Sequence, residues 1–256
     1  MAKGNRNRHQ AREKIAQARA AEARRRRRRL WLGVTGALAV VVAAVVGITV
    51  GVSGGGDASN PPRVRLAPLH TLGALQPAPS ARAQGPEAVP IARATPLAST
   101  ATITTGRTVD GIGCQTSEQT LFHIHAHLTI FINGTPRQVP AGVGIPGAQA
   151  QATPNGPFID SGTCFYWLHT HAADGVIHIE SPVQRTYTLG QFFDEWGLPL
   201  GPGQVGPARG HVTALYNGQV FLGNPRDIPL TAHAQIQLEV GKPLVAPTSI
   251  TWPSGL

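Results

Sequence analysis

Methionine is almost absent from this chain and cysteine is scarce: of 256 residues, 1 is methionine and 2 are cysteine. The methionine is Met1, so no thioether is available to a folded domain. Thioether-ligated Cu(I) carriers need methionine sulfur, and blue-copper sites use it or an equivalent weak ligand. The sequence therefore argues against such copper sites, including one with Cys164 and His169 as ligands.

Charged side chains are also few, at 14% of the chain, and they are unevenly distributed. Residues 1–29 contain 12 Lys and Arg against Glu13 and Glu22, whereas residues 108–256 contain 5 basic and 9 acidic side chains. The net charge of +9 is therefore a property of the N-terminal tail. An oxygen-ligated calcium site has little support in so sparse a set of carboxylates.

Residues 30–52 form a run of 23 residues without any charge. As a helix with a rise of ~1.5 Å per residue, this run is about 34 Å long, enough to cross a bilayer core of about 30 Å. The six arginines Arg24–Arg29 precede it directly. Such a positive flank stays cytoplasmic and is attracted to anionic lipid headgroups.

We therefore predict a single-pass cell-membrane protein with a basic cytoplasmic tail (1–29) and a transmembrane helix (30–52), its remaining residues being extracytoplasmic. A cleaved signal peptide is the alternative, but Gly51–Ser59 contains no convincing Ala-x-Ala cleavage site. The basic arm is short, and we predict no nucleic-acid binding from it.

Residues 53–107 are rich in glycine, alanine, proline and serine and poor in aromatic residues. Such a composition does not bury enough apolar area to offset the loss of chain entropy, which predicts a disordered linker. Residues 108–256 follow, and their length is typical of one domain.

Strand patterns dominate residues 108–256. His123–Ile132 alternates and is followed by Asn133-Gly134, the residue pair of a tight hairpin turn. Val212–Tyr216 and Asn217-Gly218 repeat that arrangement, and Leu230–Val240 alternates again.

A single helix is predicted after Thr188, which has the capping-box spacing to Gln191, and Gly197 ends it. The predicted fold is mainly β: an antiparallel β-sandwich or barrel-like extracytoplasmic domain with one short helix.

Cys114 and Cys164 are the only two cysteines, and both fall in the domain predicted to lie outside the membrane. Oxidising compartments favour pairing, so we predict a disulfide between them. It would tie the segment before the first group of histidines to the strand that carries the second.

Histidines alternate in Phe122–Ile132. Even positions form an unbroken apolar face, and His123, His125 and His127 lie together on the opposite face. A single histidine there is usually an ordinary polar residue. Three alternating imidazoles are able to share one metal ion while neutral.

A second group of histidines lies in Cys164–Glu180. With Ala172–Gly175 as the loop of a hairpin, His169 would pair with His178, and three histidines and one glutamate would share a face. The candidate metal ligands are therefore His123, His125, His127, His169, His171 and His178. Glu180 is predicted to support a ligand instead of binding the ion, and Asp174 to be a turn residue.

Three runs together resemble a group of uncharacterised bacterial proteins that are membrane-anchored or exported: His123-x-His-x-His, Leu168-His-Thr-His-x-x-Asp-Gly-x-Ile-His-x-Glu180 and Thr188-Leu-Gly-Gln-Phe-Phe-x-x-Trp-Gly197. The resemblance covers residues 109–256 and implies no established activity. Phe122–His125 is also similar to the first copper-ligand pair of copper/zinc superoxide dismutases. However, Ala126-His127 replaces that family's Gly-Asp, and its bridging-histidine region has no match.

We therefore expect an extracytoplasmic domain that binds copper or zinc for buffering, sensing or delivery of the ion. All-imidazole sites suit both metals. One alternative is a metal-dependent oxidoreductase or hydrolase with an open coordination position. Another is a protein-interaction domain without a metal, and nothing in the sequence names its partner.

Overall fold

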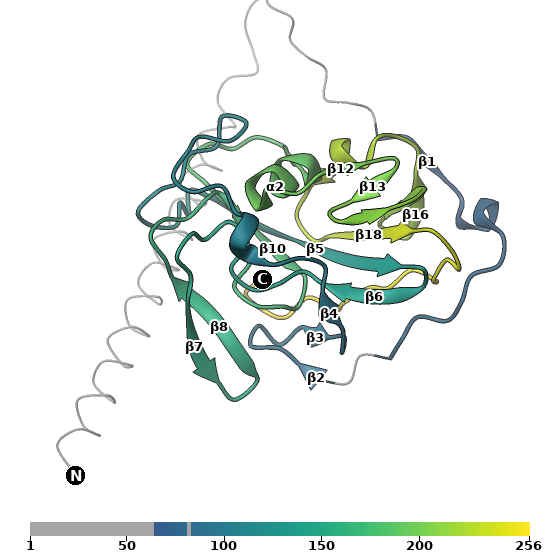
Figure 1. Cartoon of the computed structure of the whole chain (residues 1–256), viewed down its shortest axis with the longest axis horizontal. Helices are drawn as coiled ribbons and strands as arrows, with labels where there is room; N and C mark the ends of the chain where they lie inside the picture. Colours follow the sequence, from purple (N-terminus) through teal and green to yellow (C-terminus); the bar gives the residue numbers. More distant parts are fainter. Residues whose placement is uncertain (1–63, 81–82) are drawn as a thin grey trace, which may run out of the picture. The chain divides into compact units, whose positions relative to one another are not determined.

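The computed structural model describes residues 64–80 and 83–256, which belong to one compact unit (Figure 1). Within these ranges, no helix is long and apolar enough to cross a membrane. The predicted cytoplasmic tail (1–29) and transmembrane helix (30–52) lie outside the described residues.

A nine-stranded sheet organises the domain, with β5 (Phe122–Ile132) at its centre. The antiparallel strand β10 (Val176–Ser181) pairs with the first half of β5, and β6 (Thr135–Gln138) pairs with its end. On the other side, β18 (Ala234–Val240) runs parallel to β5. The sheet is completed by β15 (Val212–Tyr216), β16 (Gln219–Phe221), β1 (Leu66–Ala67), β9 (Leu168–His169) and β4 (Thr95–Pro96).

Both predicted Asn-Gly hairpins are confirmed. Asn133-Gly134 joins β5 to β6, and Asn217-Gly218 joins β15 to β16. All four residues have positive φ angles, between 50° and 78°. Asparagine tolerates and glycine favours this conformation, and it matches the twist of the paired strands.

The apolar face of β5 packs in the main core, as its alternation predicts. Ala126, Leu128 and Ile130 are buried there together with aromatic residues of the only α-helix in the described ranges, α2 (Leu189–Trp196). The predicted capping box and the left-handed glycine that ends this helix are both present. Each fully buried aromatic or aliphatic side chain contributes roughly 1.5–3 kcal/mol, so this layer is a major source of stability.

Smaller paired elements surround the sheet. One hairpin, β7 with β8, projects from the body of the domain (Figure 1). The strands of these smaller sheets are β2 (Ala83–Gln84), β3 (Pro90–Ile91), β7 (Gln149–Thr153), β8 (Gly156–Ser161), β11 (Tyr187–Thr188), β12 (Leu200–Gly201), β13 (Gln204–Val205), β14 (Ala208–Arg209) and β17 (Pro229–Leu230). Three 3-10 helices complete the elements: η1 (Leu69–Leu72), η2 (Thr100–Thr102) and η3 (Pro225–Asp227).

The mainly β prediction with one short α-helix is confirmed, but the strands in the described ranges form no closed barrel. Mainly antiparallel pairing was also predicted and is observed, and the exceptions are the parallel pairs β5 with β18 and β4 with β6. The alternation of side chains along a strand shows which residues share a face, but it does not show which strand lies beside it. Strands that are far apart in sequence lack a tight turn to fix their relative direction.

The described part of the predicted linker is ordered and packs on the domain, which corrects the expected disorder up to residue 107. Strand β1 pairs with β16, and β4 pairs with β6. Val89 and Leu97 are buried. This segment needs few apolar residues because exposed sheet edges offer free backbone donors and acceptors to any extended chain.

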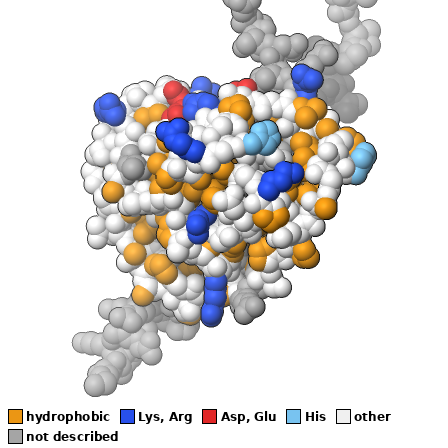
Figure 2. All heavy atoms as spheres, turned by 45° about the vertical axis from the view of Figure 1, so that its right-hand side comes forward, with side chains coloured by type: hydrophobic (Ala, Val, Ile, Leu, Met, Phe, Trp, Pro, Cys, Tyr) orange, Lys and Arg blue, Asp and Glu red, His pale blue; other side chains and the backbone are white. Residues whose placement is uncertain are grey.

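The second face of the sheet is also covered. Backbone N–H groups of the C-terminal segment donate hydrogen bonds to strand β18: Val245 to Glu239 and Thr248 to Gln237, both at 2.8 Å. Figure 2 shows one side of the exterior, where basic side chains are scattered between apolar ones. The polar sheet face predicted from alternation is therefore largely an interior surface, on which His125 and His127 are buried while His123 is exposed.

Candidate metal centre

Three neighbouring strands, β5, β10 and β9, place histidines in register. His178 on β10 lies opposite His125 on one side and His169 on the other. Glu180 lies opposite His123. The predicted pairing of His169 with His178 is thus confirmed, and it follows from the two-residue periodicity of strands.

His171 lies beyond the end of β9, in a longer loop than the four residues predicted. Its backbone carbonyl accepts a hydrogen bond from Ile159 on β8 at 2.9 Å, and its ring stacks on Phe158. The β7–β8 hairpin therefore holds His171 beside the sheet. Asp174 accepts from the backbone of Val176, which confirms its predicted role in the turn.

Four side chains converge into one buried group: His169, His171, His178 and Glu180, whose ligand atoms all lie within 4.8 Å of one another. His123 and His125 form a second group with the same His178. Strands β9 and β5 flank β10, so the two groups share its central histidine.

Backbone carbonyls fix the protons of two of these rings. His169 Nδ1 donates to the carbonyl of Tyr166 at 2.8 Å, and His171 Nδ1 donates to that of Ile159. A carbonyl only accepts, so in each neutral ring the proton is on Nδ1 and the lone pair is on Nε2. The two Nε2 atoms are 3.2 Å apart, each presenting a lone pair to the other.

His178 is oriented by carboxylates. Its Nε2 lies 2.7 Å from an oxygen of Glu87, and its Nδ1 lies 3.4 Å from Glu180. Glu87 comes from the turn between β2 and β3, and its side chain is buried. A carboxylate on the far nitrogen of a histidine is a common support for a metal ligand.

The electrostatics separate the neutral rings from the charged one. Burial, followed by neighbouring histidines, lowers the pKa of His125 and of His169 to about 3. Burial also favours the neutral form of His178, but hydrogen bonds to Glu180 and Glu87 outweigh it and raise its pKa to about 9. At neutral pH, His125 and His169 therefore have free lone pairs, and His178 carries a proton that an ion would have to displace.

Glu180 is ionised in this environment. Burial alone raises its pKa, but hydrogen bonds to His123 and His178 outweigh that effect and hold it well below the usual range. Its Oε2 has no hydrogen-bond partner in the described part of the chain. Glu180 thus belongs to the ligand group itself, in addition to the supporting role predicted from the sequence.

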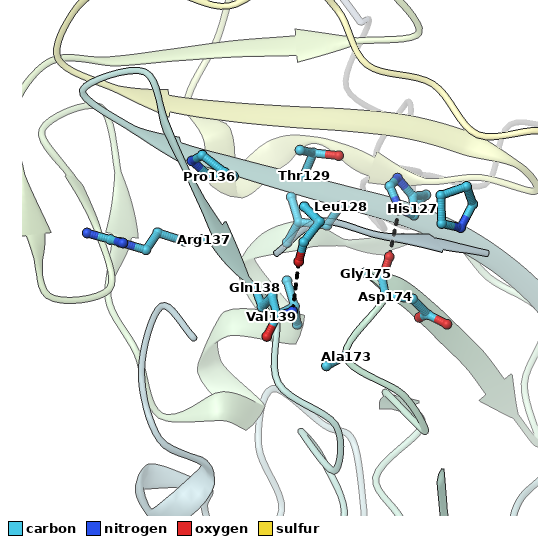
Figure 3. A pocket seen from close by; sticks show the side chains of 12 residues that line it. His127, Leu128, Thr129, Pro136, Arg137, Gln138, Val139, Ala173, Asp174 and Gly175 are labelled. Atoms are coloured by element: carbon cyan, nitrogen blue, oxygen red, sulfur yellow. Dashed lines mark hydrogen bonds between the residues drawn. The ribbon is translucent and has the colours of Figure 1, made fainter. Parts of the chain in front are cut away.

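His127 belongs to neither group. Its Nε2 donates to the carbonyl of Asp174 at 2.9 Å (Figure 3), and burial lowers its pKa to about 4. The pocket beside it measures about 60 Å³, enough for a few water molecules. The structure therefore does not bring the predicted ligand His127 into either group. Its partner on β10 is Val176, which has no ligand atom to offer.

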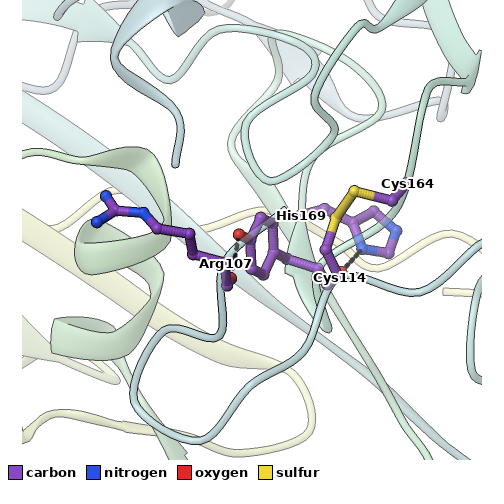
Figure 4. The surroundings of a disulfide bond; sticks show 5 residues. Arg107, Cys114, Cys164 and His169 are labelled. Carbon is purple, nitrogen blue, oxygen red and sulfur yellow. Dashed lines mark hydrogen bonds between the residues drawn. A yellow bond between two sulfur atoms is a disulfide. The ribbon is translucent and has the colours of Figure 1, made fainter. Parts of the chain in front are cut away.

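The predicted disulfide is present between Cys114 and Cys164, whose Cα atoms are 5.5 Å apart. Figure 4 shows His169 beside it. Tyr166, two residues after Cys164, donates from its hydroxyl to the carbonyl of Arg107, and its backbone carbonyl accepts from His169 Nδ1. The covalent bond thus restrains the segment that fixes the tautomer of His169.

Sequence reasoning missed two carboxylates, Glu87 and Glu118. The second lies 3.5 Å from His171 and is 35% exposed. A signal for Glu87 exists in the sequence, since it is the only acidic residue between Asp57 and Asp110. A lone acid in a Pro- and Ala-rich segment has few structural uses, and here it meets a buried histidine.

Nitrogen ligands with one carboxylate are typical of zinc and also suit copper. The histidine and glutamate groups could hold such an ion. No protein family matches the chain, and no curated protein or solved structure is significantly similar to it. The resemblance to membrane-anchored or exported bacterial proteins therefore stays a prediction.

Proposed function

We propose that this protein binds a divalent transition-metal ion, zinc or copper, through His169, His171, His178 and Glu180. The observation that carries the proposal is the pair of Nε2 lone pairs on His169 and His171, 3.2 Å apart. Their protons are held on the opposite nitrogens by Tyr166 and Ile159.

While both rings are neutral, neither Nε2 carries a proton, so the two lone pairs repel each other. A metal ion bound between the two nitrogens removes this repulsion. With metal–nitrogen bonds of 2.0–2.1 Å and tetrahedral angles, two ligand nitrogens lie about 3.3 Å apart. The observed separation is close to this value. The pair is therefore arranged for a metal before one arrives, and such preorganisation lowers the cost of binding.

Binding is favoured over catalysis because all four residues of this group are buried. A site closed by four protein ligands leaves no position for a substrate. For the ion in this group, buffering, sensing or delivery is therefore a better match than an oxidoreductase or hydrolase activity.

We further propose that the domain is held outside the cell membrane by residues 30–52. The charge-free run and the arginines before it support an anchor with a cytoplasmic N-terminus. The disulfide supports an oxidising compartment. An ion-binding domain in that position would take up copper or zinc close to the membrane.

Elemental analysis tests the proposal. The full chain, purified in detergent, is exposed to Zn²⁺ or Cu²⁺ and then freed of unbound ion. We expect bound metal in the wild type and in the control His211→Ala, whose exposed histidine lies outside both groups. The double variant His169→Ala/His171→Ala should lose the most tightly held equivalent. A wild type that retains neither metal would refute the proposal.

A further inference from the structure

Two pairs of histidines lie on opposite sides of β10. His169 and His171 follow one another on the β9 side, and His123 and His125 alternate along β5. The Nε2 atoms of the second pair are 3.0 Å apart. Between the pairs stands His178, whose ring centroid is 4.5 Å from that of His125 and 4.5 Å from that of His171.

One ion does not account for both pairs. A tetrahedral ion takes four ligands, and its ligand atoms lie about 3.3 Å from one another. The centre contains five imidazoles and Glu180, which fall into two groups that share only His178. Neighbouring strands are about 4.8 Å apart, so β5 and β9, on either side of β10, start about 10 Å apart.

The carboxylate of Glu180 is placed to join two ions. Its Oε1 lies 3.0 Å from His123 Nε2 on one side and 3.4 Å from His178 Nδ1 on the other. Its Oε2 makes no hydrogen bond to any described residue. A carboxylate has two oxygens and is able to bind one ion with each, as in two-metal sites with ions ~3.5–4 Å apart.

The local charge also suits two dications. Glu87, Glu118 and Glu180 all contact histidines of the centre, at 2.7–3.5 Å. Buried cations need such compensation because the interior screens their repulsion weakly. The three carboxylates together carry a charge of −3, so one dication leaves −1 and two leave +1, and the local charge is compatible with a second ion.

We propose that the centre holds two metal ions bridged by Glu180, one on His169, His171 and His178 and a second on His123 and His125. This rests on the proposed metal-binding function. The second ion has only three protein ligands, which leaves one position open to water or to an incoming ligand. The His123 side chain is 37% exposed, so this position faces solvent.

The two positions differ in how firmly they hold an ion. Backbone carbonyls fix the tautomers of His169 and His171, whereas the Nε2 of His123 contacts His125 and Glu180. An ion at the outer position must replace these contacts and stays open to water. It is therefore the exchangeable ion, through which the buried position is loaded.

Titration of the metal-free full chain with Co²⁺, followed by absorbance and electron paramagnetic resonance, tests this. The wild type should bind two equivalents with magnetic coupling between them, and a chelator should remove one much faster than the other. His123→Ala/His125→Ala should bind one slow equivalent without coupling, and His211→Ala should match the wild type. Glu180→Gln should lose the coupling.

The outcomes separate this inference from the proposed function. A wild type that saturates at one equivalent, or a His123→Ala/His125→Ala variant that keeps two, overturns the two-ion centre and leaves the single site intact. A wild type that binds no ion overturns both. Circular dichroism and thiol titration confirm that each variant is folded, and His123→Asn/His125→Asn replaces the alanine pair if that pair is not.

Discussion

The contact between Glu87 and His178 gives the sharpest test of how the fold prepares the site. The carboxylate oxygen is 2.7 Å from Nε2, and both side chains are buried. Glu87→Gln retains an oxygen that accepts a hydrogen bond while removing the charge. Loss of such a support for a ligand histidine weakens metal binding typically ~10–100-fold, or about 1.4–2.7 kcal/mol.

The size of this loss depends on pH in a direction that the structure fixes. Hydrogen bonds to Glu180 and Glu87 outweigh the effect of burial and raise the pKa of His178 to about 9. Below that pH an ion competes with a proton, so wild-type affinity should rise about tenfold per pH unit up to pH 9. Removal of the charge on Glu87 lowers the pKa of His178, so a proton then competes less strongly with the metal ion for this ring. The variant should therefore lose most affinity near pH 9 and least near pH 6.

Competition with a chelator of known zinc affinity, at pH 6, 7, 8 and 9, measures how the zinc affinity of the wild type and of Glu87→Gln changes with pH. Glu118→Gln is the matched control, because its carboxylate is 35% exposed and 3.5 Å from His171, where solvent screens its charge. It should change affinity less than threefold. Equal zinc affinity of Glu87→Gln and wild type at pH 9, or a larger loss at pH 6 than at pH 9, would refute the reasoning.

Three further predictions concern stability. Replacement of Cys114 and Cys164 by alanine should lower the free energy of unfolding by about 4 kcal/mol, since the bond closes a loop of 50 residues; a loss below 1 kcal/mol in urea denaturation would contradict this. Burial raises the pKa of Glu195 well above its usual value, so the folded state keeps a proton that the unfolded state releases above pH 4.5. Stability is lost as pH rises from there, and Glu195→Gln should stabilise by about 1–3 kcal/mol at pH 7 and by little at pH 4; equal melting-temperature shifts at both pH values would disprove it. Gly144 has a φ of +72°, and a Cβ there would lie 2.3 Å from the carbonyl oxygen of Leu168, so Gly144→Ala should cost more than about 2 kcal/mol and weaken zinc binding; an unchanged melting temperature would rule that out.

Local periodicity predicted the parts of the site that lie on one strand or one hairpin. Alternation alone places His123 and His125 on one face, and the turn after His171 brings His169 opposite His178. These relations depend on the geometry of single strands and short turns, which the sequence encodes within about ten residues.

The remaining parts depend on contacts between distant segments. His127 lies on the same face of β5 as His125, yet its Nε2 donates to the carbonyl of Asp174 and it belongs to neither group of ligands. Glu87 reaches His178 across 91 residues. No periodic pattern predicts either contact, because each joins segments that are far apart in the sequence and meet only in the folded domain.

Composition also misrepresented the segment that carries Glu87. Its prolines and alanines predict disorder when the chain is considered alone, because they bury little apolar area. In the fold, β2 pairs with β3, and the turn between them brings a charged carboxylate to a buried histidine. The hydrogen bond from His178 to Glu87 fixes the turn to the domain. Breaking it would leave a buried charge without a partner, which is strongly destabilising.

This anchor connects the fold to the proposed chemistry. A histidine-rich sheet face without an ion is consistent with an ordinary polar interior, provided that no two ring nitrogens face each other with lone pairs. His127 meets that condition, because its Nε2 donates to the backbone carbonyl of Asp174. His169 and His171 do not, because both donate through Nδ1 and then face each other with lone pairs at 3.2 Å. The difference between these histidines is one of proton position, and it favours a bound cation over a structural role for the face as a whole.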